Sequence, residues 1–361
     1  MVEAPLEEAA HTGQNVRDVL ISVVVPTWNG RRLLPLPLDS LRRQRHDDFE
    51  VIVVDDASTD GTAEWIEATY PEVRLVKLPR NRGFAAAVNA GIRAARGEGI
   101  ALLNNDAEAD DDWLTVLDAT AAAHPEAGMV ASRVRRYHHR DYLDSAGAYA
   151  STYGSAGNLG AFEPDGPAWA QARPVLGPNG AAAFYRRAML DDVGLLDESL
   201  IAYFEDTDLA IRGQLRGWKC VYEPRAICYH VGSASYSPQS GEQAATTPPP
   251  VSRRAIFLGA RNYPMVAIKY LPLRILMADG WALAAYELNL MWFALVRGQP
   301  GAWIGARLSL LAALPHWLRQ RRTLRRHRTI SEDDLVALFR RPAVADYLRI
   351  LRVRWRRLFA R

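Results

Sequence analysis

The sequence contains little cysteine, and its net charge is small. Only Cys220 and Cys228 occur among 361 residues, too few and too weakly patterned for a disulfide framework or a zinc site. The net charge is only +3, so we expect no nucleic-acid partner. The acidic N-terminus lacks the positive start and apolar centre of a secretory signal. We therefore expect a cytoplasmic location.

Uninterrupted apolar segments long enough to cross a bilayer are also missing. Residues 275–296 are rich in Leu, Ala, Trp and Met, but Asp279 and Glu287 interrupt them, and residues 301–318 contain Arg307. A charged side chain at bilayer depth costs about 2.5–3.5 kcal/mol on insertion scales. A full membrane span is therefore not favoured.

A basic cluster follows these two apolar segments. It consists of Arg319, Arg321, Arg322, Arg325, Arg326 and Arg328. Basic residues beside Trp-rich amphipathic helices suit the anionic cytoplasmic face of a membrane, so we expect peripheral attachment to the inner face of the cell membrane. The alternative is that these helices pack on the rest of the chain or on a second subunit, with the arginines solvated.

The composition divides the chain into four segments. Residues 1–20 have no apolar period and are expected to form a flexible arm. Residues 21–235 are long enough for one sizeable domain. Residues 236–252 contain three consecutive prolines and are typical of a linker or mobile loop. Residues 253–361 are expected to be helical and basic.

Short apolar runs alternate with helical patterns through the first part of the large domain. Strands are predicted over 22–25, 50–54, 73–77 and 99–103, with a helix following each. Almost uniformly apolar strands separated by helices predict a Rossmann-like α/β fold, in which helices cover both faces of a mostly parallel sheet. Residues 133–174 predict loops or short antiparallel strands. A helix from residue 204 and a last strand over 218–222 complete the domain.

Polar residues follow three of the predicted strands, at 26–29, 55–58 and 104–108. Because ligands gather at the carboxyl ends of strands in open α/β sheets, these segments are expected to converge on one site. Trp28 could form a wall for a planar base or a sugar, and Asp56 could accept hydrogen bonds from ring N–H or hydroxyl groups. Taken singly, each is as readily explained as a packing residue or a turn residue.

Two residues late in the domain are candidates for chemistry. Asp206 lies in an acidic cluster with apolar flanks, where neighbouring charge and burial could raise its pKa into the range of a general base. Adjacent Glu205 is interpreted as a charge that complements the helix dipole. His230 is expected in a loop after the last strand, where it could ligate a metal if it meets Asp106 across a cleft.

Several segments, in this order, carry a family resemblance. They are Val24 to Asn29, Val53 to Gly61, Asn81 to Asn89, Leu103-Asn104-Asn105-Asp106, G-A-A-A-F-Y-R-R from Gly180, V-G-L-L-D-E from Val193, Glu205 to Leu209, and P-R-A-I-C-Y-H ending at His230. Together they resemble the motifs of inverting family 2 glycosyltransferases with the GT-A fold, in particular a bacterial rhamnosyltransferase-like subgroup. The resemblance covers roughly residues 20–235.

The resemblance implies roles for the first residues of the site. Pro26, Trp28 and Asp56 match positions that hold the nucleotide base, and Gly83 matches a loop that lines the nucleotide. Asn105 is expected to hydrogen-bond around the donor. Residues 21–132 would then bind the nucleotide sugar, and residues 133–235 would bind the acceptor and supply the catalytic group.

It also implies a metal site and a base. Asp106 matches the last aspartate of the D-x-D metal motif, and His230 a histidine that completes metal coordination. Asp206 matches the general base. The sequence departs from the family at Asn104, where many relatives have the first aspartate of D-x-D, so the identity of the cation stays open.

The implied function is inverting transfer of a sugar, rhamnose as the first choice, from a dTDP- or UDP-sugar to a hydroxyl of a lipid-linked or cell-envelope saccharide. The implied cofactor is Mg²⁺ or Mn²⁺. Two alternatives stay open. One is a sugar-nucleotide hydrolase or nucleotidyltransferase on a similar sheet. The other is a non-catalytic nucleotide-sugar-binding or scaffold protein of an envelope assembly.

Overall fold

The computed structural model describes residues 21–232 and 252–342. The predicted arm over 1–20 and the predicted linker over 236–252, apart from Ser252, lie outside the described residues. So do residues 343–361 of the predicted helical region.

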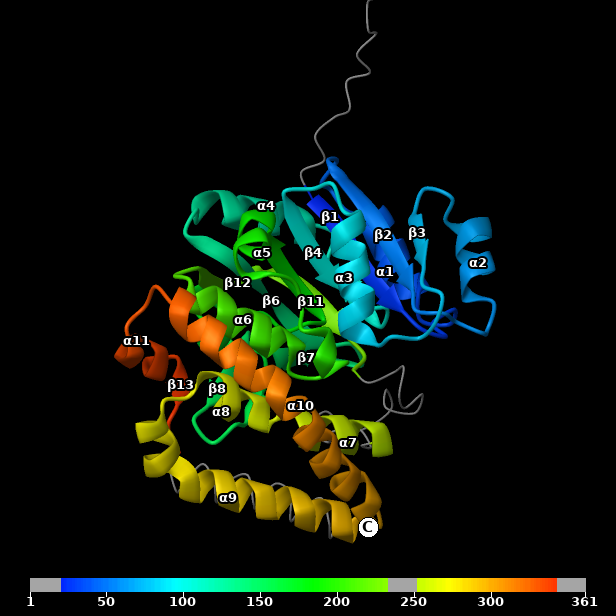
Figure 1. The fold of residues 1–361 in the computed structure, drawn as a ribbon. Helices are drawn as coiled ribbons and strands as arrows, with labels where there is room; N and C mark the ends of the chain where they lie inside the picture. The colour runs from blue at the N-terminus through cyan, green and yellow to red at the C-terminus, as the bar shows by residue number, and fades with distance from the viewer. Residues whose placement is uncertain (1–20, 233–251, 343–361) are drawn as a thin grey trace, which may run out of the picture.

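Four parallel strands form one half of a ten-stranded mixed sheet (Figure 1). They are β1 (Ile21–Thr27), β2 (Phe49–Asp55), β3 (Arg74–Lys77) and β4 (Gly99–Leu103), in the spatial order β4-β1-β2-β3. All four overlap the predicted strands. β1 is buried along its whole length, as expected of a central parallel strand covered on both faces.

The other half of the sheet is mixed. β11 lies antiparallel between β4 and β6, β12 lies parallel to β6, and the full order is β10-β12-β6-β11-β4-β1-β2-β3. The bounds are β5 (Ala107–Ala109), β6 (Ala127–Arg136), β7 (His139–Ser145), β10 (Arg173–Pro174), β11 (Ala182–Arg186) and β12 (Lys219–His230). A second sheet has the order β13-β8-β9, with β8 (Ala148–Ser151), β9 (Ala156–Asn158) and β13 (Phe339–Arg340). The short antiparallel strands predicted within 133–174 are therefore present.

Helices cover both faces of the large sheet. Their bounds are α1 (Pro35–Arg42), α2 (Thr62–Thr69), α3 (Phe84–Ala94), α4 (Trp113–Ala123), α5 (Arg187–Val193) and α6 (Glu205–Leu215). Successive side chains of a strand point to opposite faces. Val24 of β1 accordingly packs in the core with α3 and α6, whereas Val23 and Val25 pack with α1 and α4. The predicted α/β class, a largely parallel sheet covered by helices, is confirmed.

The C-terminal part is helical, as predicted. Its helices are α7 (Arg253–Asn262), α8 (Pro264–Tyr270), α9 (Leu273–Val296), α10 (Pro300–His327) and α11 (Glu332–Ala337). α10 continues through Pro315, with Ala313 and Trp317 buried on either side. Across residues 21–232 and 252–342, no helix combines the length and hydropathy that a membrane crossing requires.

α8 and part of α10 belong to the main core. Met265 and Val266 of α8 are fully buried with residues of α3 and α6, and so is Trp317 of α10. Figure 1 shows α10 running alongside α6, while α9 lies at the base of the molecule, away from β1–β4.

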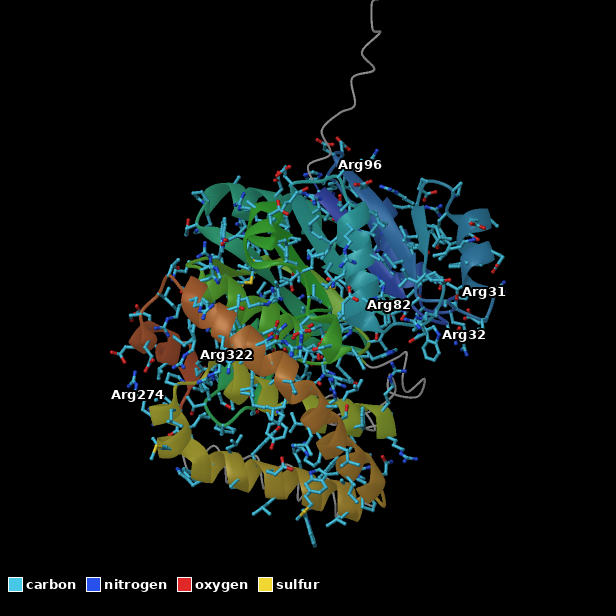
Figure 2. All side chains as sticks on the ribbon, in the orientation of Figure 1. Arg31, Arg32, Arg82, Arg96, Arg274 and Arg322 are labelled. Carbon is cyan, nitrogen blue, oxygen red and sulfur yellow. The ribbon has the colours of Figure 1, made fainter. Side chains whose placement is uncertain are left out.

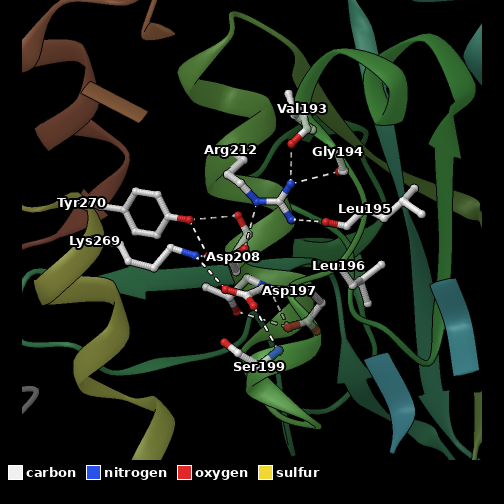
Figure 3. Close-up of polar contacts among 12 residues, drawn as sticks. Val193, Gly194, Leu195, Leu196, Asp197, Ser199, Asp208, Arg212, Lys269 and Tyr270 are labelled. Atoms are coloured by element: carbon white, nitrogen blue, oxygen red, sulfur yellow. Dashed lines mark hydrogen bonds and ion pairs between the residues drawn. The ribbon is translucent and has the colours of Figure 1, made fainter. Parts of the chain in front are cut away.

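A buried ion cluster joins α8 to α6 (Figure 3). The Lys269 ammonium is fully buried, contacts the carboxylate of Asp208 and lies 3.3 Å from Asp197 Oδ2. Asp208 also accepts hydrogen bonds from Tyr270 Oη at 2.5 Å and from Arg212 Nε at 2.9 Å. Burial raises the pKa of Asp208, but Lys269 and Arg212 outweigh it and lower that pKa overall. The pKa of Asp197 is lowered as well, so both carboxylates stay ionised beside the buried cations.

Removal of the Lys269 charge should destabilise the fold strongly. In Lys269→Met, the carboxylates of Asp208 and Asp197 lose their shared cation inside the core, so we expect the free energy of unfolding to fall by about 3–5 kcal/mol. Urea unfolding followed by circular dichroism measures this. The matched control is Arg274→Met, because Arg274 pairs with Glu332 and Asp333 at the surface and its loss should cost about 0–1 kcal/mol. Equal losses in the two variants would contradict this role of Lys269.

Candidate active site

The carboxyl ends of β1 and β2 meet at one edge of the sheet. Figure 2 marks this edge by Arg31, Arg32 and Arg82, whereas Arg96, just before β4, lies at the opposite edge. The loops after β1 and β2 are tied together, because Asp56 N donates to Thr27 O at 2.8 Å and Thr59 N donates to Asn29 Oδ1 at 2.8 Å.

A cavity of about 740 Å³ opens at this edge. Its wall contains all eight residues selected from the sequence, namely Pro26, Trp28, Asp56, Gly83, Asn105, Asp106, Asp206 and His230. The structure thus brings together side chains that are up to two hundred residues apart in the chain. The volume is that of a typical small-ligand site.

Asp56 organises the donor side of the cavity. Its carboxylate accepts hydrogen bonds from the backbone N–H of Arg82 at 2.7 Å and of Gly83 at 2.8 Å, so it shapes the loop before α3. Burial raises the pKa of Asp56, and the two N–H groups oppose that effect. Gly83 has φ +88°, and a Cβ there would lie 2.6 Å from Ile201 Cγ2, so this position requires glycine. Trp28 leaves 37% of its surface exposed at the cavity wall.

Three polar residues follow β4 directly. Asn105 is buried and donates from Nδ2 to Thr27 Oγ1 at 3.1 Å, which ties the β4 loop to the β1 loop. Asn104 Oδ1 is buried without a hydrogen-bond partner among the described residues, and Asn104 lines the cavity. Asp106 is buried beside them.

His230 is the last residue of β12, so its predicted position in a loop is wrong. The predicted last strand was too short, because β12 pairs with β6 along most of its length and then with β5. The pairing with β5 places His230 opposite Ala107, next to Asp106. His230 Nε2 lies 3.2 Å from Asp106 Oδ1, and Nδ1 lies 2.8 Å from Asp144 Oδ2. Burial lowers the pKa of His230, but the two carboxylates outweigh it and raise that pKa well above its usual value.

By themselves, these residues supply only part of the ligand set that a hard divalent cation requires. Asp106 supplies a carboxylate, His230 an imidazole, and Asn104 Oδ1 an unpartnered buried amide oxygen at the same wall. Within residues 21–232 and 252–342, no three His, Cys, Asp or Glu side chains are arranged so that they could hold a metal ion. The donor set therefore fits a cation that takes its remaining ligands from phosphate oxygens and water.

Asp206 faces the cavity from the first turn of α6. Its Oδ2 accepts a hydrogen bond from Gly180 N at 3.1 Å, and its Oδ1 accepts one from Thr207 N at 2.6 Å. Burial raises the pKa of Asp206, while these N–H groups oppose the increase. The carboxylate is therefore held in place by backbone donors and has the raised pKa that the sequence predicted.

Glu205 has a different role from the one expected. Its side chain is buried at the cavity wall, and Oε2 has no hydrogen-bond partner in the described part of the chain. Burial and the charges of Asp206 and Asp208 raise the pKa of Glu205 to about 8. A carboxyl with that pKa is mostly protonated at neutral pH, so it does not supply the negative charge that dipole complementarity requires.

Further residues of the cavity had no signal in the sequence. They include Arg136 and Asp144 at the ends of β6 and β7, Tyr149 and Phe162 within residues 133–174, Tyr203 before α6, and Arg254 in α7. Asp144 lies in a stretch without hydrophobic period, and only the fold shows that it contacts His230. Arg254 lies beyond the segments that carry the family resemblance.

Comparison with known proteins agrees with this fold. A sequence profile described as "Glycosyl transferase family 2" matches residues 22–194. The N-acetylglucosaminyl-diphospho-decaprenol L-rhamnosyltransferase of Mycobacterium tuberculosis is 32% identical over 240 residues, which cover 58% of this chain and 76% of that protein. Uncharacterized protein y4gI of Sinorhizobium fredii is 33% identical over 228 residues, or 60% of this chain and 25% of that protein. The chain thus spans about a quarter of that second relative.

A solved structure, TarS of S. aureus, has a similar fold. It aligns with a TM-score of 0.50 and 21% identity over 88% of this chain and 54% of TarS. The mixed sheet, with its cavity at the strand ends, defines a glycosyltransferase fold of the GT-A type. The chain belongs to glycosyl transferase family 2, and the predicted family and enzyme class are confirmed.

The raised pKa of Glu205 makes stability depend on pH. The folded state keeps a proton that the unfolded chain loses above about pH 4.5, so this contribution is complete at low pH and is lost as pH rises to about 8. Glu205→Gln cannot ionise. We expect the free energy of unfolding of the wild type, relative to this variant, to fall by roughly 2–4 kcal/mol from pH 5 to pH 8.

Urea unfolding at several pH values measures the difference. Glu223→Gln is the control, because the pKa of buried Glu223 is lowered overall by its contacts with Arg225, and its titration lies below this window. A difference between wild type and Glu205→Gln that stays constant from pH 5 to pH 8 would show that Glu205 is ionised in the folded protein.

Proposed function

We propose that the protein is an inverting glycosyltransferase that uses a nucleoside-diphosphate sugar, with Asp206 as the general base. The observation that carries this proposal is the placement of Asp206 in the same cavity as Trp28 and Asp56. One wall then has groups suited to a nucleotide, and the other has a carboxylate held by backbone N–H donors. A base has to lie within hydrogen-bond reach of the hydroxyl it deprotonates, and a shared cavity of this size allows it.

In this mechanism, the nucleotide base lies between Trp28 and Pro26, and Asp56 accepts hydrogen bonds at its edge. Asp206 takes the proton from an acceptor hydroxyl as that oxygen attacks the anomeric carbon. The bond from that carbon to the diphosphate breaks on the opposite face, so the configuration inverts in a single displacement. The backbone donors from Gly180 and Thr207 keep the carboxylate aimed into the cavity.

Asp106 and His230 would hold a divalent cation, Mg²⁺ or Mn²⁺, with the amide oxygen of Asn104 beside them. When bound, the cation supplies Lewis-acid stabilisation of the charge on the leaving diphosphate. Asp144 keeps the other imidazole nitrogen engaged and so orients His230 toward Asp106.

We propose rhamnose as the sugar, a dTDP- or UDP-sugar as the donor and a lipid-linked or cell-envelope saccharide as the acceptor. The name of the M. tuberculosis relative describes L-rhamnosyl transfer to a decaprenol-linked sugar, and that relative is matched over 76% of its length. In this chain, residues 133–174 supply Arg136, Asp144, Tyr149 and Phe162 to the cavity, which supports an acceptor site formed by this part of the chain.

We further propose that the molecule attaches to a membrane surface through the exposed apolar face of α9. Leu273, Met277, Trp281, Leu288, Trp292 and Leu295 are exposed there at helical spacing. The charged residues of α9 are engaged elsewhere: Arg274 pairs with Glu332, Asp279 with Arg341, and Glu287 with Arg307. Apart from Arg274 near its N-terminal end, the exposed face of α9 is therefore without charge, which suits insertion into the interfacial region of a bilayer.

The arginines of α10 contribute less to this surface than the sequence indicated. Arg321 points inward and donates to the carbonyls of Ile268 and Leu271, which end α8. Arg322 and its exposed neighbours lie toward the end of α10 that is near α6, away from α9 (Figures 1 and 2). Attachment is thus attributed mainly to apolar contact, and we propose the inner face of the cell membrane as its location.

Asp206→Asn should nearly abolish glycosyl transfer without weakening the binding of the nucleotide-sugar donor. We expect kcat to fall about 10²–10⁴-fold, because the amide cannot accept the proton, while donor affinity stays unchanged. Product formation from a panel of nucleotide sugars, with separate donor titration, measures both. Asp192→Asn, which changes a carboxylate paired with Arg216 outside the cavity, is the control and should keep wild-type kcat. Near-normal turnover by Asp206→Asn would refute the base, and release of free sugar by the wild type would favour a hydrolase.

Charge placed on the exposed face of α9 should release the protein from vesicles. In Trp281→Glu/Leu288→Glu, two large apolar groups are replaced by acids, so we expect the partition coefficient onto phospholipid vesicles to fall about tenfold or more. Cosedimentation with the vesicles measures it. Ala68→Glu/Ala122→Glu adds the same charge on α2 and α4 and should bind as the wild type does. Equal binding by all three proteins would exclude α9 as the attachment surface.

A further inference from the structure

The segment directly before the catalytic helix has an unusual backbone. Ile201, Tyr203 and Phe204 have φ values of +67°, +67° and +72°, a left-handed conformation that residues with a Cβ seldom adopt. Such a conformation persists only where the surrounding structure imposes it. Phe204 precedes Glu205, the first residue of α6. The conformation of this segment therefore determines the position of Asp206 in the first turn of α6.

One side chain from α7 holds this segment. Asn262 is fully buried, and its Nδ2 donates to the carbonyls of Leu200, Ala202 and Tyr203 at 2.8, 3.0 and 3.0 Å. The contact therefore specifies the irregular backbone and not a standard turn.

Arg261 fixes the orientation of the Asn262 amide. Its Nη1 donates to Asn262 Oδ1 at 2.7 Å and to Ser199 O at 2.8 Å, and its Nε donates to Ser309 Oγ at 2.9 Å in α10. Because the Arg261 guanidinium donates to Oδ1, the NH₂ group of Asn262 has to face the three carbonyls. The pair thus links α7 and α10 to residues 199–203.

The held segment contacts both sides of the cavity. Ile201 O accepts a hydrogen bond from Ala85 N at 3.0 Å at the start of α3, and Ile201 packs against Gly83. Ala202, Tyr203 and Phe204 line the cavity, whereas Asn262 is not part of its wall. Asn262 therefore cannot touch substrate and acts through the backbone of this segment.

We infer that Asn262 is a positioning residue for glycosyl transfer, which keeps residues 200–204 in the conformation that aims Asp206 at the acceptor hydroxyl. The C-terminal helices then take part in catalysis through this amide, in addition to any role at a membrane. This inference rests on the proposed role of Asp206 as the base. Its consequence is a defect in kcat, because the nucleotide side of the cavity is organised separately by Asp56.

The test compares Asn262→Ala and Asn262→Ser with the wild type in the full chain. We expect kcat to fall about 10²-fold in Asn262→Ala, because a displacement of the base by about an ångström has that effect. Asn262→Ser keeps one donor and should lose less. Donor affinity, measured by titration with the nucleotide sugar, should be unchanged in both. A folded variant with wild-type kcat would overturn the inference, and so would a loss confined to donor affinity.

Asn89→Ala is the matched control. Asn89 is also buried and bonds backbone through its amide, at Leu196 N and O, but it lies outside the cavity wall. We expect this variant to lower the melting temperature as Asn262→Ala does and yet to keep kcat. Equal losses of kcat in the two variants would show that general loosening is responsible, which would overturn the positioning role.

Hydrogen–deuterium exchange separates this inference from the proposed function. The amides of residues 199–204 should exchange faster in Asn262→Ala than in the wild type, and those of Arg82 and Gly83, which donate to Asp56, should not. If the wild type transfers no sugar to any acceptor, the proposed function fails, while faster exchange at 199–204 still supports the contact. Unchanged exchange there would overturn the inference whatever the activity.

Discussion

The buried ion pair between Lys269 and Asp208 is the constraint on which much of this structure depends. An isolated charge in a protein interior is costly, so neither helix that carries these residues can move away without exposing the other charge. Asp208 lies two residues after Asp206, and Lys269 lies in α8. The pair therefore fixes the helix that carries the proposed base against the C-terminal helices, and Tyr270 and Arg212 complete the pairing.

This constraint changes how the C-terminal helices are understood. α8 contributes apolar residues to the main core, and α7 contributes polar contacts to the segment before α6, so both helices act as part of the catalytic body. α9 differs, because its outer face is apolar and its charged residues point to neighbours. One region of the chain thus has two physically distinct parts, one that supports the site and one that presents an apolar surface.

The residues of the site are brought together in two ways, by the ends of parallel strands and by long-range strand pairing. The loops after β1, β2 and β4 converge because parallel strands end at the same edge, which places Trp28, Asp56 and Asp106 near one another. His230 is placed in the site by the antiparallel pairing of β12 with β5. Its two carboxylate neighbours, Asp106 in the turn after β4 and Asp144 in β7, raise its pKa together.

The sequence by itself determined the local order of the fold. β-branched runs ended by Gly, Asp and Asn predicted β1 to β4, and the types of residue at their ends selected Trp28, Asp56 and Asp106, since these signals depend on neighbours in the chain. Only the tertiary structure decided the length of β12, the protonated state of Glu205, the contact of Asp144 with His230 and the contact of Asn262 with residues 200–203. Each of these depends on burial or on a partner far away in the sequence, and neither leaves a periodic pattern that a single sequence can show.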